Sequence, residues 1–521
     1  MNLLPEYYPT TDLDSTCSRV STTYFDEFHT HAASYCDPNS PSNLTCFHRR
    51  SGFGGKIDSF CFGQGAALNV DEGKFQLDCS LRKFSEQEEM DGLLSFHRLP
   101  GYWYETGPAF VFSMAVNVQE SKFQPTGGGK EMQEKVQESQ ILEPNTTLGV
   151  PPPKTLLLVK REGEGNPWHC LMEILSTYLT FDILRMPGGS FGEDSPLFKY
   201  PGDEDDTQVI ILDDRDDGPY FDLWTLFARR KPVRLAELLS DQSISSNLDD
   251  VNLIVPLAGS SNPLWQDDAG NQQCTDSPVL DVFSRRVRDF YGIQDPPVRD
   301  GDKPIVLTFI NRRDTRRLQN QRYLFSKLQK RNSHIKVQMI DFAAIPFSEQ
   351  VRVARETDIL VGVHGAGMTQ SMFMHQRAGA VVEIQPDILD HNGFRNIAVM
   401  RGLGYYRTHA KRISPEEWRE GEEEQEDMGE ENSEGEDTQP KSENTPLKTT
   451  GRAKRGGTNR EGRQINVEES GEIPEIVDSR IMKREGWHGS DVDIEESRFF
   501  EVVEAAIMFM YQKGPWKYDI N

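Results

Sequence analysis

DILVGVHGAGMTQSMFMHQRAGAVVEIQ, residues 358–385, is the stretch that decides the fold of this chain. It joins an apolar run at 359–363 to a glycine-rich turn, a helical segment and a second apolar run that contains Glu383. A short, fully apolar run is typical of a parallel strand that is covered on both faces. Gly365 and Gly367 lack a Cβ, so a ligand can approach the turn closely. The stretch therefore predicts one βα unit of a nucleotide-binding sheet.

The turn and Glu383 are the first candidate site residues. A helix is expected to begin at the turn, and its free amides and dipole would offer a seat for a diphosphate. The turn residues are His364, Gly365, Ala366 and Gly367. Glu383 follows at the carboxyl end of the strand expected at 380–384, where an open α/β sheet places its ligands, and its carboxylate could hold ribose hydroxyls. The alternative is a tight turn with packing glycines, a core histidine and a surface carboxylate.

The same alternation of strands and helices extends on both sides of this stretch. Strands are expected at 156–160, 208–213, 251–257, 305–310, 335–340, 359–363, 381–384 and 405–408. Helices are expected at 167–185, 279–291, 318–330, 348–357 and 493–513, with further helices after 363 and after 384. Such alternation implies parallel sheets with helices on both faces. The fold class is therefore α/β, with two doubly wound domains facing each other.

Composition divides the chain further. The expected segments are a Cys-rich beginning at 1–122, a linker at 123–154, a first α/β domain at 155–300, a second at 301–412, an insert at 413–477 and a closing helix at 478–521. The linker is rich in glycine, proline and polar residues. The insert has an acidic run followed by a basic run and almost no large apolar residues, which is typical of disorder.

The overall charge excludes one class of partner. The formal net charge of −26 in 521 residues argues against nucleic acid, because binding phosphates needs a basic face. Much of this charge is local, however, since residues 416–437 are nearly all acidic or polar. A hydrophobic content of 36% is enough to bury the cores of two or three domains.

The cysteines indicate an oxidising compartment. Five of the seven lie in the first 80 residues: Cys17, Cys36, Cys46, Cys61 and Cys79. Their spacing does not match a zinc site, and two glycosylation sequons, at Asn43 and Asn145, favour the lumen of the endoplasmic reticulum or Golgi. The first residues lack a signal peptide. We therefore expect a signal or anchor outside this sequence, which would be the only membrane contact; the alternative is a cytosolic protein.

Arginines follow the strand expected at 305–310. They are Arg312, Arg313, Arg316 and Arg317. The carboxyl end of this strand lies at the same sheet edge as the glycine-rich turn, so a guanidinium could clamp a diphosphate with two hydrogen bonds. Arg316 and Arg312 are the preferred candidates, and the alternative is surface pairing with Asp302 and Asp314. Around this turn no spacing suggests a metal site, so we expect no cofactor, although Mn²⁺ remains an alternative.

A second candidate site lies in GEGNPWHCLMEI, residues 163–174. Asn166 matches a helix N-cap, and His169 and Glu173 lie one helical turn apart. A histidine with a carboxylate partner can serve as a general base. A pair on a helix surface and a weak metal site are the alternatives.

Four aspartates follow the strand expected at 208–213. They are Asp213, Asp214, Asp216 and Asp217, in ILDDRDDG. Their pattern is similar to an Asp-x-Asp metal motif, but acidic loops of this kind are common. Asp214 is the competing candidate for the general base.

Together these motifs resemble glycosyltransferase family 61, and within it the branch of endoplasmic-reticulum enzymes that transfer N-acetylglucosamine to proteins. VGVHGAGMTQSMFM resembles the family's Gly-x-His-Gly-Ala-Gly-Leu-Thr segment. DTRRLQNQ resembles its Arg-x-x-x-Asn stretch, which maps to Arg316 and Asn320. GNPWHCLMEI resembles its Asn-x-x-His-x-x-x-Asp, with Glu173 in place of Asp. IILDDRDDGPYFDLW resembles the strand and loop that bring Asp214 and Asp222 to the cleft, with Asp222 and Asn166 on the acceptor side.

The resemblance implies two Rossmann-like domains of the GT-B type, an inverting mechanism and a UDP-sugar held by the second domain. It implies transfer of N-acetylglucosamine from its UDP form to Ser or Thr hydroxyls of luminal proteins. The arginines and the turn would stabilise the leaving UDP, Glu383 would hold the ribose, and His169, oriented by Glu173, would take the acceptor proton. The alternatives are a transferase that uses UDP-xylose or another UDP-sugar on a glycan, and an inactive scaffold of the same fold.

The sequence also departs from the family pattern. Residues 229–232 are Arg-Arg-Lys-Pro where the animal enzymes carry Asp-Tyr-Asp, the chain ends KYDIN without a retention signal, and the insert from 413 is extra. The closing Gly514-Pro-Trp516 does match the family's end. These departures bear on the acceptor, the donor sugar and the compartment.

Overall fold

The computed structural model describes most of the chain. The described residues are 3–8, 15–50, 57–119, 153–187, 197–198, 202–241, 248–266, 270–271, 273–295, 303–414, 417–418 and 489–512. Nearly all of the linker and insert expected at 123–154 and 413–477 lies outside these residues, as do Asn145 and the closing Gly514-Pro-Trp516.

The second half of the chain forms a sheet that is parallel except at one edge. Its strands are β10 (Ile305–Ile310), β11 (Ile335–Ile340), β12 (Ile359–Val363), β13 (Ala380–Pro386), β14 (Gly404–Ile413) and β15 (Asp491–Asp493). They lie in the order β11-β10-β12-β13-β14-β15, and β15 alone of these strands pairs antiparallel. The strands predicted at 305–310, 335–340 and 359–363 are confirmed with the same bounds.

Helices cover both faces of this sheet. They are α10 (Gln321–Arg331), α11 (Phe347–Glu356), α12 (Gly393–Met400) and α15 (Glu496–Gln512). Alternate residues of one strand enter different cores: Val361 packs with the side chains of α10 and α15, and Leu360 packs with those of α11 and α12. This alternation explains why the strands read as continuous apolar runs, since both faces are buried.

The segment after the glycine-rich turn corrects one expectation. It is a 3-10 helix, η8 (Ala366–Phe373), rather than an α-helix. Met368, Met372 and Phe373 are fully buried, and η8 packs against α11, α12 and two helices of the first half, α4 (Pro167–Arg185) and α9 (Pro278–Phe290). A segment enclosed from several sides has no polar face, so the periodicity of a surface α-helix does not describe it.

The first half of the chain forms a mixed sheet. Its strands are β1 (Ala32–Ser34), β2 (Asn43–Arg50), β3 (Ile57–Asn69), β4 (Lys74–Asp78), β5 (Val116–Gln119), β6 (Thr155–Val159), β7 (Thr207–Ile211), β8 (Val233–Arg234) and β9 (Val251–Val255). The order is β1-β2-β3-β9-β6-β7-β8; off this path, β4 pairs with β3, and β5 pairs with β4. Only β9-β6-β7-β8 is the parallel set expected from the sequence, because β3 adds antiparallel to β9. The Cys-rich segment therefore extends the first sheet.

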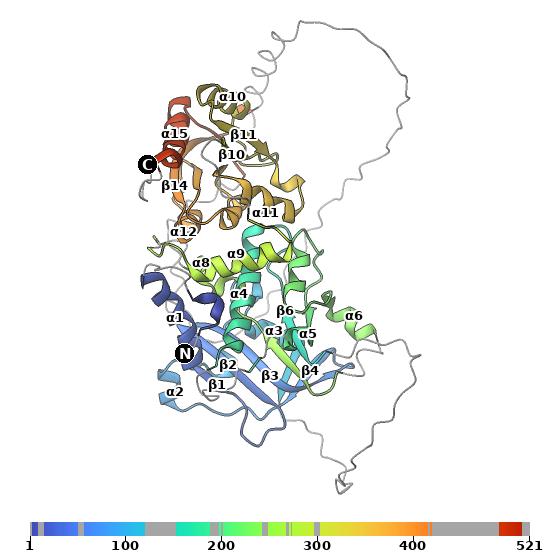
Figure 1. The fold of residues 1–521 in the computed structure, drawn as a ribbon. Helices are drawn as coiled ribbons and strands as arrows, with labels where there is room; N and C mark the ends of the chain where they lie inside the picture. The colour runs from blue at the N-terminus through green and yellow to red at the C-terminus, as the bar shows by residue number, and fades with distance from the viewer. Residues whose placement is uncertain are drawn as a thin grey trace, which may run out of the picture.

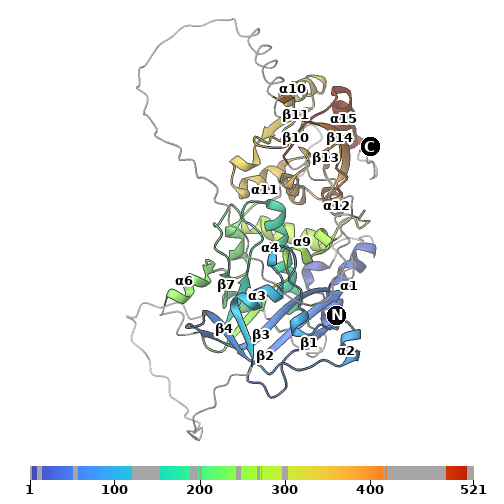
Figure 2. The ribbon, with the colours of Figure 1, turned by 180° about the vertical axis from the view of Figure 1, so that it is seen from behind.

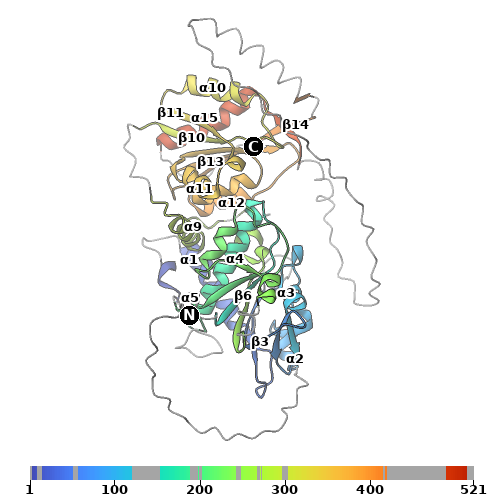
Figure 3. The same cartoon turned by 90° about the vertical axis from the view of Figure 1, so that its right-hand side faces the viewer.

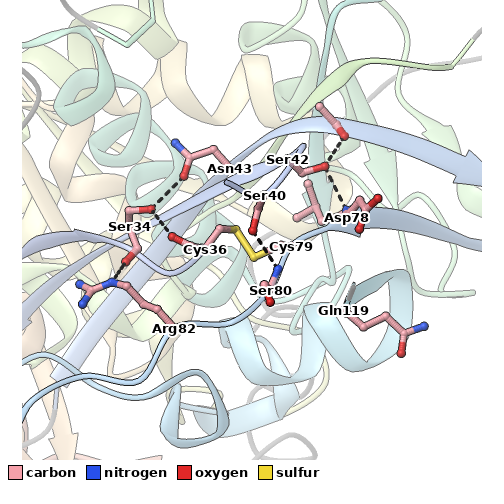
Figure 4. Close-up of a disulfide and its surroundings, with 12 residues drawn as sticks. Ser34, Cys36, Ser40, Ser42, Asn43, Asp78, Cys79, Ser80, Arg82 and Gln119 are labelled. Carbon is pink, nitrogen blue, oxygen red and sulfur yellow. Dashed lines mark hydrogen bonds between the residues drawn. A yellow bond between two sulfur atoms is a disulfide. The ribbon is translucent and has the colours of Figure 1, made fainter. Parts of the chain in front are cut away.

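Disulfides hold the Cys-rich strands. Cys46 and Cys61 are bonded to each other from facing positions of β2 and β3, and Cys36 is bonded to Cys79. Figure 4 shows the second bridge with Ser40, whose hydroxyl accepts a hydrogen bond from the Ser80 amide at 3.0 Å. Cys274 is also disulfide-bonded, and Cys170 is a free, buried thiol. The prediction of disulfides is confirmed.

The two halves pack closely against each other. Figure 1 shows the first sheet below and the second above, with α4 and α9 between them, and Figures 2 and 3 show the same arrangement from behind and from the side. Arg401 and Asp281 form an ion pair of 2.9 Å across this junction, and Arg377 and Asp276 one of 2.8 Å. None of the helices in the described residues is long and apolar enough to cross a lipid bilayer.

Candidate functional site

Two arginines lie against the glycine-rich turn. A Cβ added to Gly365 would lie 2.8 Å from Arg316 Nη1 and 3.1 Å from Arg312 Nη1, so both guanidinium groups reach the Gly365 backbone. Arg316 Nη1 donates a hydrogen bond to the His364 carbonyl oxygen at 3.1 Å. Gly365 has a φ of 156°, which L side chains rarely adopt. The structure thus brings Arg312, Arg316 and the turn together, as the sequence analysis expects.

Burial disfavours the charged form of both guanidinium groups. Burial, together with the positive charge of Arg312, lowers the pKa of Arg316 to about 10, and burial lowers the pKa of Arg312. Arg316 also has a left-handed backbone with φ 55°, which is uncommon for a residue other than glycine and points to a functional constraint. An anion bound between these side chains would offset both the burial and the repulsion. We call Arg312, Arg316 and Gly365 the arginine clamp.

Glu383 lies beneath the clamp and supports His364. His364 Nδ1 lies 2.5 Å from Glu383 Oε1, and the Tyr405 hydroxyl donates to Glu383 Oε2 at 2.5 Å. Burial alone would raise the pKa of Glu383, but the hydrogen bonds and charge of His364 and the bond from Tyr405 hold it below its usual value. The carboxylate is fully buried with both oxygens engaged, which does not match the expected contact with ribose hydroxyls. Its position makes it a support for the His364 ring.

The other residues predicted to bind the donor are the rest of the turn and Asn320. The His364 amide donates to the Ile384 carbonyl oxygen at 2.9 Å, so this amide is not open to a diphosphate. Ala366 and Gly367 begin η8, and Gly367 packs on Ile310. Asn320 is the N-cap of α10, with a left-handed φ of 56°.

His169 belongs to the first half and is oriented by Glu162. His169 Nδ1 lies 2.8 Å from Glu162 Oε2, whereas Glu173 Oε1 accepts a hydrogen bond from the Glu162 amide at 2.5 Å. The expectation that Glu173 orients His169 is therefore wrong. The Glu173 side chain is buried, and it instead holds the loop that carries Glu162. Asn166 is the N-cap of α4, since its side chain accepts a bond from the Trp168 amide at 3.0 Å.

The two carboxyl groups behind His169 have raised pKa values, and His169 opposes the rise for Glu162. Burial raises the pKa of Glu162, and burial and the nearby Glu162 raise the pKa of Glu173 well above its usual value. Glu162 Oε1 is buried without a hydrogen-bond partner among the described residues. A Cβ at Gly259 would lie 2.6 Å from this oxygen, so glycine is required there. One oxygen of Glu162 thus lacks a partner among the described residues, whereas both oxygens of Glu383 accept hydrogen bonds.

Aromatic rings connect the two histidines. The His169 ring lies 4.8 Å from that of Trp265, and the Trp265 ring lies 5.9 Å from that of Trp168. The Trp168 ring in turn lies 5.7 Å from that of Phe394, which is 5.2 Å from His364. Since Phe394 belongs to α12 and Trp168 to α4, contacting rings link His169 to the turn of the other half.

The acidic loop after β7 binds an arginine. Arg161 forms an ion pair of 2.7 Å with Asp213, and it also donates to the carbonyl oxygens of Arg215, Asp216 and Asp217. No group of three or more His, Cys, Asp or Glu side chains in the described residues could hold a metal ion. Of the four aspartates, only Asp213 contacts Arg161 through its carboxylate, while Asp216 and Asp217 do so through their carbonyl oxygens.

The remaining acidic candidates lie apart from the arginine clamp. Asp214 is exposed on the loop after β7. Asp222 accepts a hydrogen bond from the Tyr291 hydroxyl at 2.9 Å, and burial raises its pKa.

Sequence reasoning missed Glu162, Tyr405, Trp265 and Phe394. Glu162 was visible only as one acidic residue in a glycine-rich loop, and its distance of seven residues from His169 has no regular helical meaning. The other residues are recognisable only after folding brings their segments together.

Sequence comparisons relate this chain to known glycosyltransferases. The family model described as Glycosyltransferase 61 matches residues 168–381, a range that includes His169, the arginine clamp and His364. The "EGF domain-specific O-linked N-acetylglucosamine transferase" of Drosophila melanogaster is 27% identical over 251 residues, which are 48% of this chain and 44% of that protein. The proteins of the same name from Canis lupus familiaris and Gallus gallus are each 31% identical over 134 residues, 25% of this chain and 25% and 24% of theirs. The chain thus spans less than half of the length of these relatives.

Proposed function

We propose that this chain, whose residues 168–381 match the family model of glycosyltransferase 61, transfers a sugar from a UDP-sugar to a Ser or Thr hydroxyl of a protein. The arginine clamp is the observation that carries the proposal, because it offers a diphosphate two guanidinium groups against a glycine backbone. The names of the relatives favour N-acetylglucosamine as the sugar and an EGF domain as the acceptor. The two packed halves would correspond to the donor and acceptor domains of a GT-B enzyme.

The clamp would act on the leaving group. Negative charge develops on UDP as the bond between the anomeric carbon and the diphosphate oxygen breaks, and preorganised cations stabilise such charge. Arg312 and Arg316 would gain most as this charge appears, since burial disfavours both charged forms beforehand and the charge of Arg312 further disfavours that of Arg316. In this mechanism the arginines do the work that a metal ion does in other sugar transferases, and no cofactor is required.

His169 would act on the acceptor. Its Nδ1 faces Glu162, so a neutral ring that donates from Nδ1 has Nε2 available to accept a proton. The acceptor oxygen would attack the anomeric carbon from the face opposite UDP, its proton would pass to Nε2, and the configuration would invert. Glu162 stabilises the imidazolium that forms. Asp214, exposed on the loop after β7, is the competing base.

The compartment is inferred from the disulfides. The bonds Cys36–Cys79 and Cys46–Cys61 persist in an oxidising environment, and EGF domains are themselves disulfide-rich secreted modules. We therefore place the reaction in the lumen of the endoplasmic reticulum or Golgi.

The test is UDP release from a panel of UDP-sugars, with EDTA or Mn²⁺, in the presence of an EGF domain. We expect release from UDP-N-acetylglucosamine that survives EDTA and that Arg316→Ala reduces by about a hundredfold or more. Arg313→Ala is the matched control, because Arg313 lies on the same loop but is 59% exposed beside Asp341.

Other results would select the alternatives. Preference for UDP-xylose with a glycan acceptor would replace the proposed donor and acceptor. Absence of both UDP release and UDP binding would identify an inactive scaffold. Equal loss in the Arg316 and Arg313 variants would refute the clamp.

A further inference from the structure

An exposed aromatic turn lies beside His169. Residues 102–105 are Tyr-Trp-Tyr-Glu, and we call them the aromatic turn. Trp103 and Tyr104 are each 53% exposed, although large aromatic side chains usually avoid water. The Tyr104 ring lies 5.0 Å from the His169 ring, edge to face. The turn therefore combines two solvent-facing rings with a contact to the proposed base.

Several hydrogen bonds hold the turn in place. The Tyr102 hydroxyl donates to buried Asp58 at 2.6 Å, and Lys160 Nζ donates to the Tyr104 carbonyl oxygen at 2.5 Å. The Gly107 amide closes the loop on the Gly101 carbonyl oxygen at 2.8 Å. A Cβ at Gly107 would lie 2.3 Å from the Pro100 carbonyl oxygen, so the closure requires glycine. The turn is thus a rigid element whose rings are presented in a fixed direction.

The backbone of the turn is strained. Tyr102, Tyr104 and Glu105 have φ values of 57°, 58° and 58°. Positive φ is a marked exception for bulky residues, and clusters of such residues usually serve binding or catalysis. The strained backbone holds the half-exposed Tyr104 ring against His169.

The position of His169 identifies that ligand. Since Nδ1 faces Glu162, an acceptor hydroxyl must approach Nε2. Neighbouring residues of an extended polypeptide are about 3.3–3.6 Å apart along the chain, so residues next to the acceptor Ser or Thr would reach the ring of Tyr104. Rigid aromatic side chains bind polypeptides well because they bury much area and lose little conformational entropy.

We propose that the aromatic turn docks the acceptor polypeptide, with Tyr104 and Trp103 contacting the residues that flank the modified Ser or Thr. The inference rests on the proposed function and names the part of the site that selects the acceptor. The donor lies at the arginine clamp, on the other half of the molecule, so loss of the turn would weaken acceptor binding and leave donor binding intact.

The experiment uses the full chain, a folded EGF domain with a Ser or Thr acceptor, and UDP-N-acetylglucosamine. Trp103→Ala and Tyr104→Ala are expected to raise the KM for the EGF domain about tenfold or more, as truncation of an aromatic anchor does. UDP affinity and UDP release without acceptor are expected to stay unchanged. Tyr104→Phe keeps the ring and should restore most of the binding. Tyr511→Ala is the control, because Tyr511 is 52% exposed on α15 beside the other sheet.

Direct binding separates this inference from the proposed function. The dissociation constant of the EGF domain is measured by calorimetry, which needs no turnover. If the wild-type chain neither binds UDP nor releases it, the proposed function fails, while weaker EGF binding by the turn variants still supports the docking inference. Equal EGF affinity in wild type and variants overturns the inference, as does absence of EGF binding to any of them. A glycan that binds through the turn in place of the EGF domain also overturns it.

Discussion

The two halves of the molecule each contain a histidine paired with a buried carboxyl group, and the pairs differ in the hydrogen bonds that the carboxyl group makes. In the second half, Glu383 accepts hydrogen bonds from both His364 and Tyr405, and its pKa is held low. In the first half, one oxygen of Glu162 lies 2.8 Å from His169 Nδ1, and the other has no partner among the described residues. Burial raises the pKa of Glu162. The same residue types thus give one carboxyl group whose two oxygens are both hydrogen-bonded and one whose second oxygen has no partner among the described residues.

Replacing His169 should change the transfer rate more than any other substitution proposed here. His169→Ala is expected to lower kcat for transfer by about 10²–10⁴, the usual contribution of a general base, without changing the dissociation constant for UDP. The measurement pairs transfer kinetics with calorimetric UDP binding. His375→Ala is the control, because His375 is exposed in the second half. Near-normal kcat in His169→Ala would assign the base to another residue, with Asp214 tested next.

A methyl group at Gly365 should break the clamp. Gly365→Ala places a Cβ 2.8 Å from Arg316 Nη1 at a φ of 156°, so the arginines or the turn must shift. We expect UDP affinity to fall about 10–100-fold, which corresponds to the cost of one strained residue. Gly163→Ala is the matched control, since a Cβ there meets nothing within 4 Å. Unchanged UDP affinity in Gly365→Ala would show that the diphosphate binds elsewhere.

Neutral isosteres at the two carboxylates should change stability with opposite pH dependence. Glu383, with its lowered pKa, stabilises the fold above its unfolded pKa, and this contribution is lost as pH falls through the folded pKa. Glu383→Gln should therefore cost about 1.5–3 kcal/mol in the free energy of unfolding at neutral pH and less in acid.

Glu162 has the opposite sign, because its pKa is raised. Its bound proton favours the folded state below the unfolded pKa, and this contribution is lost as pH rises through the folded pKa. Glu162→Gln should therefore gain stability relative to the wild type as pH rises. Urea unfolding of both variants from about pH 4 to about pH 8 measures the two slopes. Slopes of the same sign would remove the distinction between the pairs.

The second half was largely predictable from the sequence. A strand that is buried on both faces is apolar throughout, which is why 305–310, 335–340 and 359–363 could be located with the bounds of β10, β11 and β12. The carboxyl ends of parallel strands meet at one edge, so Arg316 and His364 could be expected together although 48 residues separate them. The prediction that did not match concerns Glu383. Its carboxylate was expected to contact ribose hydroxyls, but it is buried and accepts a hydrogen bond from Tyr405 on the next strand.

The first half was less predictable, because its site depends on contacts between irregular segments. Helix α4, its N-cap Asn166 and the position of His169 follow from local patterns. Glu162 lies on a loop whose path is set by Glu173 and by the absence of a side chain at Gly259. Tyr104 reaches His169 from a turn 65 residues earlier, which is held by Asp58 and Lys160. Contacts of this kind leave no periodic pattern in the sequence.

The sequence by itself determined the α/β class, the disulfide-bonded beginning, the parallel strands of the second sheet and the arginines beside the glycine-rich turn. These features depend on local spacing and on which faces of a strand or helix are buried. Only the tertiary structure decided which carboxylate serves which histidine, that the Cys-rich strands extend the first sheet, and that an aromatic turn lies over His169. Those outcomes depend on burial and hydrogen bonds between distant segments, because a carboxyl group acquires its pKa and its partner only when the fold removes it from water.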